Sequence, residues 1–166
     1  MGEEIKIITT NRKAHFEYFL SDFLEAGIEL VGTEIKSIRF HGCSLNDSYI
    51  LIRNDEAFII GMNIAPFFNG NIFNHEPLRT RKLLLHKKEI RKLKQKIQEK
   101  GFTIVCTKVY LKKGRVKLEI ALAKGKKLYD KRETEAKKQA ERTMDRAMRE
   151  RNKMWGCIYD SRSCRY

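Results

Sequence analysis

The chain has 166 residues, of which 42% are hydrophobic, so it can bury one ordinary core and its length favours a single globular domain. Its 35 Lys and Arg against 21 Asp and Glu give a formal net charge of +14, a balance that attracts nucleic acid or an anionic membrane surface. We expect no membrane partner, because no apolar run approaches the roughly 20 residues that a spanning helix needs. The acidic start MGEEIKIITTN lacks the basic and apolar regions of a signal peptide, so we expect a cytoplasmic protein.

Residues 11–27 predict an amphipathic helix near the start of the chain. Asn11 is a candidate N-cap, and Gly27 is a candidate for the residue that follows the last turn. Large apolar side chains recur between them at helical spacing and are expected to face the core rather than stack on bases. They are Phe16, Phe19, Leu20, Phe23 and Leu24.

From residue 28 onward the apolar period changes to two, which is typical of β-strands. Residues 28–40, 47–53 and 57–64 each predict a strand, and residues 54–56 are a plausible tight connection between the second and the third. Residues 103–125 predict two further strands that are joined in a hairpin at a Lys-Gly pair.

A second helix is predicted between these strands at residues 86–101. Ile90, Leu93 and Ile97 recur in it at helical spacing, and Gly101 is expected to end it. Five or six short antiparallel strands cannot leave long sheet edges exposed in a soluble monomer, so we expect the sheet to close into a small barrel. The predicted fold is therefore mainly β, with an antiparallel OB-like barrel and flanking α-helices.

The last part of the chain has a different composition. From Asp130 onward it is dense in charge and has high helix propensity, but its apolar stripe is too narrow to offset the entropy cost of ordering the segment alone. The stripe consists of Ala136, Ala140, Met144, Ala147 and Met148. We therefore predict a barrel domain at residues 1–125 and a basic C-terminal tail at residues 126–166, disordered when free and helical when bound.

Basic residues gather in three packets along the chain, at residues 79–88, 108–117 and 124–127. A single run of charge is usually a solvated surface, but three packets on one small barrel would form a surface that follows phosphates. Aromatic side chains interleave with these packets, most densely in the loop 66–73. Two interpretations of this loop stay open: its rings stack on bases, or they cover one mouth of the barrel.

A catalytic or metal-dependent function finds little support in the sequence. Glu34, Asp47, Asp55 and the pair His75-Glu76 are candidate ligands for the divalent ions of a nuclease, but they occur singly. No HExxH, GxxxxGK[ST], GxSxG or GxGxxG motif is present. The four cysteines form no CxxC pair and have no zinc spacing, so we expect them to be reduced and structurally ordinary. We expect neither a cofactor nor a metal site.

Five motifs along the chain resemble those of a known family. In order, they are NRKAHFEYF, EAGIELVGTEIKSIR, GCSLNDSYILI, NHEPLRTRKLLLHKKEI and ALAKGKKLYDKR. Together they closely resemble the SmpB family, the bacterial tmRNA-binding proteins also called small protein B or SsrA-binding protein, over residues 11–150. The resemblance implies a six-stranded OB-like barrel without catalytic activity that binds the tRNA-like domain of tmRNA. It also implies delivery of alanyl-tmRNA to stalled ribosomes for trans-translation, with elongation factor Tu and alanyl-tRNA synthetase acting on the same tmRNA.

The resemblance assigns contacts to both parts of the chain. The implied tmRNA-binding residues are Asn11, Lys13, Tyr18, Glu25, Leu84, His86 and Lys117. Glu25, at the end of the first predicted helix, is expected to accept hydrogen bonds from base or ribose donors or to orient a cation. In the family the tail enters the decoding centre and the empty mRNA channel of the ribosome. The matching residues are Lys126, Lys127, Tyr129, Asp130, Lys131, Arg132, Lys137, Lys138, Arg142, Arg146, Met148 and Arg149.

Within this tail, Tyr129 is expected to stack on a ribosomal base, and the later cations are expected to meet phosphates of the channel. Residues 155–166 run past the end of the family's tail, and we assign no function to them.

Two alternative functions of the protein remain. An OB-fold ribosomal protein would have the same charge, barrel and tail, and a metal-dependent RNA nuclease is the less favoured one.

Overall fold

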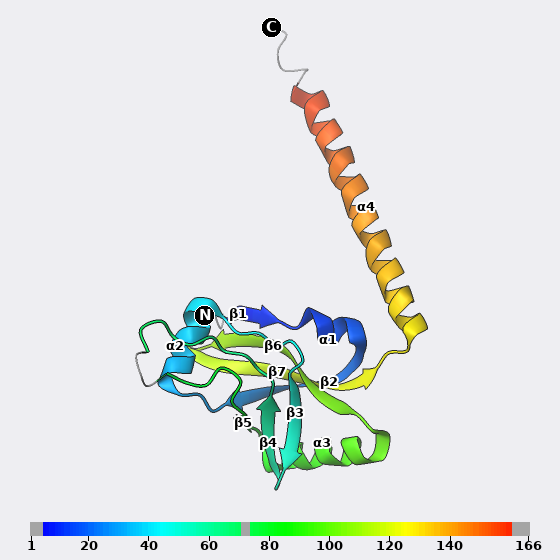
Figure 1. Ribbon diagram of the computed structural model, residues 1–166. Coiled ribbons are helices and arrows are strands. Elements are labelled where there is room, and N and C mark those ends of the chain that lie inside the picture. Colours follow the sequence, from blue (N-terminus) through cyan, green and yellow to red (C-terminus); the bar gives the residue numbers. More distant parts are fainter. Residues whose placement is uncertain (1–4, 71–73, 161–166) are drawn as a thin grey trace. The chain divides into compact units, whose positions relative to one another are not determined.

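The computed structural model describes residues 5–70 and 74–160 (Figure 1). The chain forms two compact units, Met1–Gly125 and Lys126–Tyr166. The first unit contains a β-sheet with helices around it, and the second contains the long helix α4 (Leu128–Asp160).

Within the described residues, the first unit is built around one seven-stranded sheet in which every pairing is antiparallel. Its strands are β1 (Ile5–Thr10), β2 (Tyr18–Ile28), β3 (Tyr49–Arg53), β4 (Glu56–Ile60), β5 (Arg81–Leu84), β6 (Thr103–Lys112) and β7 (Arg115–Gly125). Its helices are α1 (Arg12–Glu17), α2 (Gly32–His41) and α3 (Lys87–Lys100). The prediction of a mainly β, antiparallel fold with flanking helices is confirmed.

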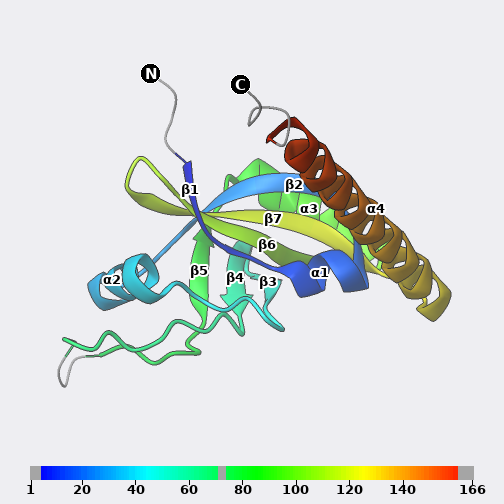
Figure 2. The same ribbon diagram turned by 90° about the horizontal axis from the view of Figure 1, so that it is seen from above.

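The pairings of β2 to β7 form a closed cycle. The order is β1-β6-β3-β4-β5-β2-β7, and β6 pairs with β7 as well, so the pairings from β6 run through β3, β4, β5, β2 and β7 back to β6. The link between β3 and β6 is short, with Ile50 opposite Ile104. β1 was not predicted and adds to the same edge of β6 further along that strand (Figures 1 and 2). Few backbone groups are therefore left at an open edge.

The predicted helix over residues 11–27 is wrong beyond its first turns. Asn11 does cap α1, because its side chain accepts a hydrogen bond from the Ala14 amide, but α1 ends at Glu17. From there the chain continues as β2, which pairs with β7 from its first residue to Gly27. The apolar pattern misled because Leu20 and Leu24 are four residues apart, a spacing that fits a strand as well as a helix. Phe19 and Phe23, expected in the core, are 50% and 52% exposed.

The predicted strand over residues 28–40 is also wrong, since most of it forms α2. Glu34, Ser37 and Ile38 are the buried residues of this helix, and their spacing of three and four is helical. Two of these buried positions are polar, so the helical period was hidden from an apolar count. The Glu34 side chain also accepts a hydrogen bond from the Val31 amide, which supports the first turn of α2.

The predicted turns and the second helix are confirmed. Asn54 and Asp55 adopt φ of 49° and 58° between β3 and β4, and Lys113 and Gly114 adopt 51° and 74° between β6 and β7. Positive φ at both central residues is typical of the two-residue hairpin turn whose twist matches the strands. α3 ends at Gly101, whose left-handed conformation leads the chain into β6.

The core lies inside the sheet and under α2 and α3. It contains Ile38 of α2, Ile59 of β4, Leu93 of α3 and Leu118 of β7, all nearly inaccessible. The consecutive leucines at the end of β5 differ in burial, because successive strand residues point to opposite faces of the sheet. Leu83 is buried, whereas Leu84 is 57% exposed.

The second unit is helical over most of its described length. At the start of α4 the Lys127 amide donates a hydrogen bond to the Asp130 carboxylate, and the Thr134 hydroxyl donates one to the Asp130 carbonyl. Met144 and Met148, on its sparse apolar stripe, are exposed. Among the helices of the described residues, none combines the length and apolar character needed to cross a membrane.

Candidate nucleic-acid interface

A groove of about 560 Å³ lies where β2, β5, β7 and α3 meet, and we call it the Leu84 groove. The structure brings four of the predicted residues to it: Glu25, Leu84, His86 and Lys117. Its remaining lining residues are Gly27, Asp55, Glu56, Lys82, Leu83, Leu85, Lys87, Glu89 and Ile90. Charged and apolar side chains therefore both line the groove around the exposed Leu84.

The local sequence explains why Leu84 stands at the centre of this groove. Gly27 lies directly opposite Leu84 in the β2–β5 pairing, not at a helix end as predicted. A Cβ atom at Gly27 would lie 3.1 Å from the Leu84 Cβ, so glycine makes room for the leucine. Two residues later the His86 amide donates a hydrogen bond to Glu89, which starts α3 and leaves the imidazole exposed at the helix N-terminus.

Glu25 lies on β2, not at the end of a helix, and is the hub of a charged cluster at the edge of the groove. Its Oε2 atom accepts a hydrogen bond of 2.6 Å from the Tyr110 hydroxyl and lies 3.5 Å from the Lys112 Nζ. Its Oε1 atom lies 3.2 Å from the Lys117 Nζ. The Tyr110 hydrogen bond, followed by the two lysines, lowers the pKa of Glu25 against the opposing effect of burial. The carboxylate is therefore ionised at neutral pH and neutralises nearby cations.

A second carboxylate on the same face has its own partners. Glu119 lies opposite Glu25 in the β2–β7 pairing, accepts a 2.6 Å hydrogen bond from the Thr107 hydroxyl and forms an ion pair of 3.2 Å with Lys108. Like charges on facing strand positions repel, so each carboxylate needs donors of its own. The basic packet of residues 108–117 is thus partly neutralised by acids of the same surface.

The first basic packet divides between the interior and the surface. Glu34 of α2 is fully buried and receives hydrogen bonds from Arg79, at 2.9 and 2.7 Å, and from Arg81, at 2.8 Å. Burial alone would raise the pKa of Glu34, but the bonds from Arg79, the Val31 amide and Arg81 outweigh burial and lower the pKa. Arg81 is also fully buried and donates to the carbonyls of Met62 and Pro77. These arginines anchor the start of β5 and the segment before it to α2, and they do not form an open phosphate site.

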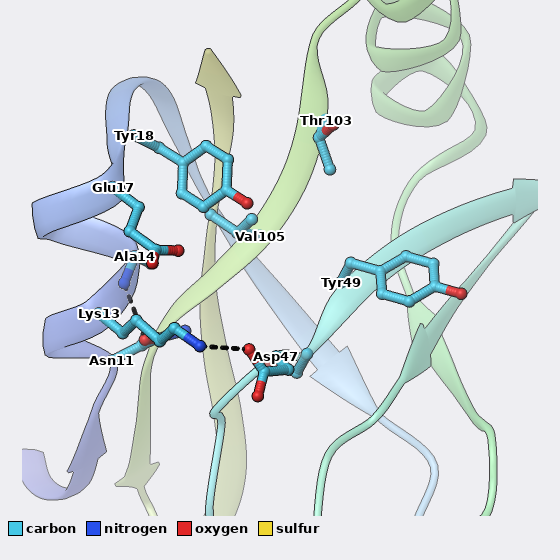
Figure 3. A pocket seen from close by; sticks show the side chains of 10 residues that line it. Asn11, Lys13, Ala14, Glu17, Tyr18, Asp47, Tyr49, Thr103 and Val105 are labelled. Carbon is cyan, nitrogen blue, oxygen red and sulfur yellow. Dashed lines mark hydrogen bonds and ion pairs between the residues drawn. The ribbon is translucent and has the colours of Figure 1, made fainter. Parts of the chain in front are cut away.

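Asn11, Lys13 and Tyr18 line a different hollow of about 320 Å³ beside α1 (Figure 3). The Asn11 amide group donates hydrogen bonds to the carbonyls of Leu45 and Cys106, each at 3.1 Å, and its carbonyl oxygen caps α1. Lys13 forms an exposed ion pair with Asp47 at 2.5 Å, and the Asp47 hydrogen bond raises the pKa of Lys13. Asn11 therefore acts as a structural bridge, and the predicted tmRNA-binding residues fall into two groups.

The predicted tail residues lie at the start and along the length of α4. Tyr129 is exposed, and Lys126 and Lys131 are half-buried. Arg142, Arg146 and Arg149 are exposed and follow one another at intervals of four and three residues, which places them on one helix face. The side chains of Lys137 and Lys138 lie outside the described part of the structure. Exposed residues of this tail also include Lys127, Arg132 and Met148, while Asp130 holds the first turn.

The aromatic loop is described only as far as residue 70, and Phe73 lies outside the described residues. Phe67 is nearly buried, and its ring centroid lies 6.0 Å from that of Phe40 and 4.9 Å from that of Phe68. Phe68 and Phe40 are largely exposed.

The carboxylates considered for a nuclease are held apart. Asp47 pairs with Lys13 and Asp55 with Lys94, while Glu34 is enclosed by arginines. The His75 ring is within hydrogen-bond distance of the Thr33 hydroxyl and the Ile64 carbonyl. Over residues 5–70 and 74–160, no three His, Cys, Asp or Glu side chains gather as metal ligands.

Two of the four cysteines are described, Cys43 and Cys106, and both are free thiols. Burial raises the pKa of each above its usual value, which favours the unreactive thiol over the thiolate. The side chain of Cys157 and all of Cys164 lie outside the described residues.

Sequence reasoning placed Lys112 in the second basic packet and Tyr110 among the aromatic side chains near it, but it did not place either of them beside Glu25. A two-residue turn at Lys113 and Gly114 fixes the hairpin register and places Tyr110 opposite Lys117, as observed. The predicted turn therefore contained the information needed to place Tyr110 beside the site. The contact with Glu25 was out of reach, because it depends on the pairing of β2 with β7.

Comparisons with known proteins agree with this arrangement. A sequence model of the SmpB family, described as "SmpB protein", matches residues 8–150. The chain is 55% identical over 148 residues to the SsrA-binding protein of Acetivibrio thermocellus, covering 89% of this chain and 96% of that protein. It is 51% identical over 150 residues to the SsrA-binding protein of Trichodesmium erythraeum, covering 90% and 96%. A chain from a solved structure described as "tmRNA-SmpB: a journey to the center of the bacterial ribosome" is 40% identical, with a TM-score of 0.61 over 72% of this chain and 85% of that chain.

The antiparallel sheet with its returning strand order, the Leu84 groove and the net charge of +14 define a small, strongly basic β-sheet protein with a groove on its surface. The family match spans most of the chain, and the aligned regions cover nearly the whole length of these relatives. The chain belongs to the SmpB family.

Proposed function

We propose that this protein binds the tRNA-like domain of tmRNA and delivers alanyl-tmRNA to stalled ribosomes for trans-translation. It would act as an RNA-binding adaptor in the cytoplasm and catalyse no reaction of its own. Family membership supports this proposal, as do the relatives named SsrA-binding protein and the related chain whose structure is described as tmRNA-SmpB.

The observation that carries the proposal is the convergence of Glu25, Leu84, His86 and Lys117 on one groove. These residues come from separate segments of the sequence, so the fold and not the local sequence brings them together. An exposed leucine beside a paired carboxylate and ammonium group suits a folded RNA, which offers an apolar base or ribose face beside phosphates and hydroxyl donors. Lys117 would meet a phosphate, and Glu25 would accept a hydrogen bond from base or ribose.

Asn11, Lys13 and Tyr18 have a supporting place in this proposal. Lys13 and Tyr18 would contact the RNA from the hollow beside α1, whereas Asn11 would act by holding α1 to β6 and the segment before β3. Lys13 would have to exchange Asp47 for a phosphate, as Lys117 would have to loosen its pair with Glu25.

We further propose that β2 to β7 form the six-stranded OB-like barrel of residues 1–125, with β1 added to its side. The returning order of strand pairings and the buried side chains enclosed by it support this assignment. A barrel has no open edges, so it can present a rigid surface to RNA from several strands at once.

The basic tail, residues 126–166, would occupy the decoding centre and the empty mRNA channel of the small ribosomal subunit. Its exposed cations would meet phosphates, Tyr129 would stack on a ribosomal base, and Met148 would lie on the apolar side. So narrow an apolar stripe supports a tail that is disordered when free and becomes helical on the ribosome. Elongation factor Tu and alanyl-tRNA synthetase would act with the protein through tmRNA.

Reconstituted ribosomes stalled on a truncated message test this function. We expect the protein to associate with them only together with alanyl-tmRNA, and we expect peptide tagging to require the protein. Stable binding to salt-washed subunits without tmRNA, combined with tagging that proceeds without the protein, would instead favour an OB-fold ribosomal protein. RNA cleavage abolished by EDTA would favour the nuclease alternative.

A further inference from the structure

We infer that Tyr110 is a positioning residue of the Leu84 groove, whose hydroxyl fixes the Glu25 carboxylate so that Glu25 holds Lys112 and Lys117 in place. The inference rests on the proposed function of the groove in binding tmRNA and goes beyond it, because Tyr110 is assigned an indirect role. The described lining of the groove includes Glu25 and Lys117 but not Tyr110.

The three contacts of Glu25 differ in strength and direction. The Tyr110 bond of 2.6 Å has the length of a strong hydrogen bond to a charged acceptor. Lys112, at 3.5 Å from the same oxygen, is at the outer limit of hydrogen bonding. Lys117 approaches the other oxygen at 3.2 Å. Tyr110 and Lys117 therefore hold the carboxylate through both of its oxygens and define one orientation, which neither lysine would define alone.

The strand register explains why Glu25 needs this donor. Glu25 faces Glu119 across β2 and β7, an arrangement that repels both side chains. Glu119 is occupied by Thr107 and Lys108. Tyr110 on β6 lies opposite Lys117 on β7. The hydrogen bond from Tyr110 therefore draws the Glu25 carboxylate toward Lys117 and away from Glu119.

The protonation states of this pair are stable around neutral pH. Burial and then the Glu25 contact raise the pKa of Tyr110, so its hydroxyl remains a donor. The Tyr110 hydrogen bond is in turn the largest effect that lowers the pKa of Glu25. A Tyr110→Phe change keeps the aromatic ring and alters no charge, so it removes the positioning bond alone.

The test is a double-mutant cycle of Tyr110→Phe and Glu25→Ala in the full chain, with affinity measured for the tRNA-like domain of tmRNA and for an elongator tRNA of equal length. We expect Tyr110→Phe to weaken binding of the tRNA-like domain by about threefold to tenfold, because the lost bond is to a charged group. We expect no further loss when Tyr110→Phe is added to Glu25→Ala. The slope of affinity against salt concentration should stay that of the wild type, since no cation is removed. Thermal unfolding of each variant establishes that the fold is intact.

Unchanged affinity in Tyr110→Phe would overturn the inference, and so would an equal loss in the Glu25→Ala background. Failure of the proposed function would look different, because the wild-type protein would then bind both RNAs equally. The inference remains testable in that case through the pKa of the Glu25 carboxyl group, measured by NMR without RNA. We expect Tyr110→Phe to raise this pKa, and an unchanged pKa would contradict the positioning role.

Discussion

The sheet unit and the tail unit carry positive charge in different ways. In the sheet unit, Lys117 and Lys112 share the Glu25 carboxylate, and Arg81 is enclosed with Glu34. In α4, by contrast, the arginines are exposed along the helix. Cations held by carboxylates have defined positions and suit a specific RNA surface, whereas exposed cations on a helix attract any polyanion and depend strongly on salt. We therefore attribute specificity for tmRNA to the groove, and we propose that the cations of the tail serve binding to the ribosome and not to tmRNA.

The largest effect should come from removing the tail. Truncation after Gly125 should abolish peptide tagging on stalled ribosomes, while affinity for the tRNA-like domain of tmRNA should stay within a few-fold of the full chain. The physical reason is that the groove lies entirely in the first unit. If truncation weakened the tRNA-like domain complex as much as Lys117→Ala does, the division of labour between the two units would be wrong.

The next largest effect concerns stability. Glu34→Ala leaves Arg81 fully buried without its carboxylate partner, which should lower the free energy of unfolding by about 3–5 kcal/mol. Denaturant titration measures this change. Asp47→Ala is the matched control, because its pair with Lys13 is exposed and screened by solvent, so its loss should change stability little. Similar losses in the two variants would contradict the buried role of the Glu34 cluster.

Removing the exposed leucine should weaken RNA binding with little effect on the fold. Leu84→Ala should reduce affinity for the tRNA-like domain by about tenfold, as expected for an apolar contact near the centre of an interface. Leu78→Ala is a matched control, since Leu78 is also 57% exposed but does not line the groove. Equal effects of the two changes would remove Leu84 from the interface.

A smaller effect on RNA affinity should distinguish a lysine in the groove from a lysine elsewhere on the surface. Lys117→Met should reduce affinity for the tRNA-like domain several-fold and reduce the salt slope by about one unit, as for the loss of one phosphate contact. Lys92→Met removes the same charge from the exposed side of α3 and should change affinity much less. Equal losses of affinity in Lys117→Met and Lys92→Met would contradict the claim that the position of Lys117 matters beyond its charge.

The smallest effect should appear in the pH dependence of stability. The folded pKa of Glu25 is lowered from its ordinary value of 4.5, so its contribution to stability is present above that value and is lost as pH falls through the folded pKa. Wild type and Glu25→Gln should therefore differ in stability at pH 7 and converge in acid. Denaturant titrations across pH 3–7 measure the difference, and a constant gap over that range would contradict the assigned shift.

Parts of this arrangement follow from the sequence, and other parts depend on long-range pairing. The Lys113 and Gly114 turn fixes the register of β6 with β7, so the neighbourhood of Lys117 could be predicted. The change from helix to strand at residue 18 could not, because Leu20 and Leu24 fit both periods and the β2–β7 register shifts between Ser21 and Leu24. That shift decides which β2 residues face Tyr110 and Lys117.

The Glu34 cluster was equally hidden. The sequence places Arg79 and Arg81 in a basic packet before a run of leucines, where they resemble surface cations. The burial of Arg81 and the partial burial of Arg79 depend on a carboxylate on α2, 47 and 45 positions earlier. Arg81 also needs carbonyls such as that of Met62. Composition therefore overestimated the positive charge available to RNA at this place.

The central claim is that the Leu84 groove recognises the tRNA-like domain of tmRNA specifically. A titration of that domain against an elongator tRNA of equal length, at two salt concentrations, tests it most directly. Our account predicts a preference for the tRNA-like domain that survives the higher salt. Equal affinities with parallel salt slopes would contradict it, because charge alone would then explain the binding.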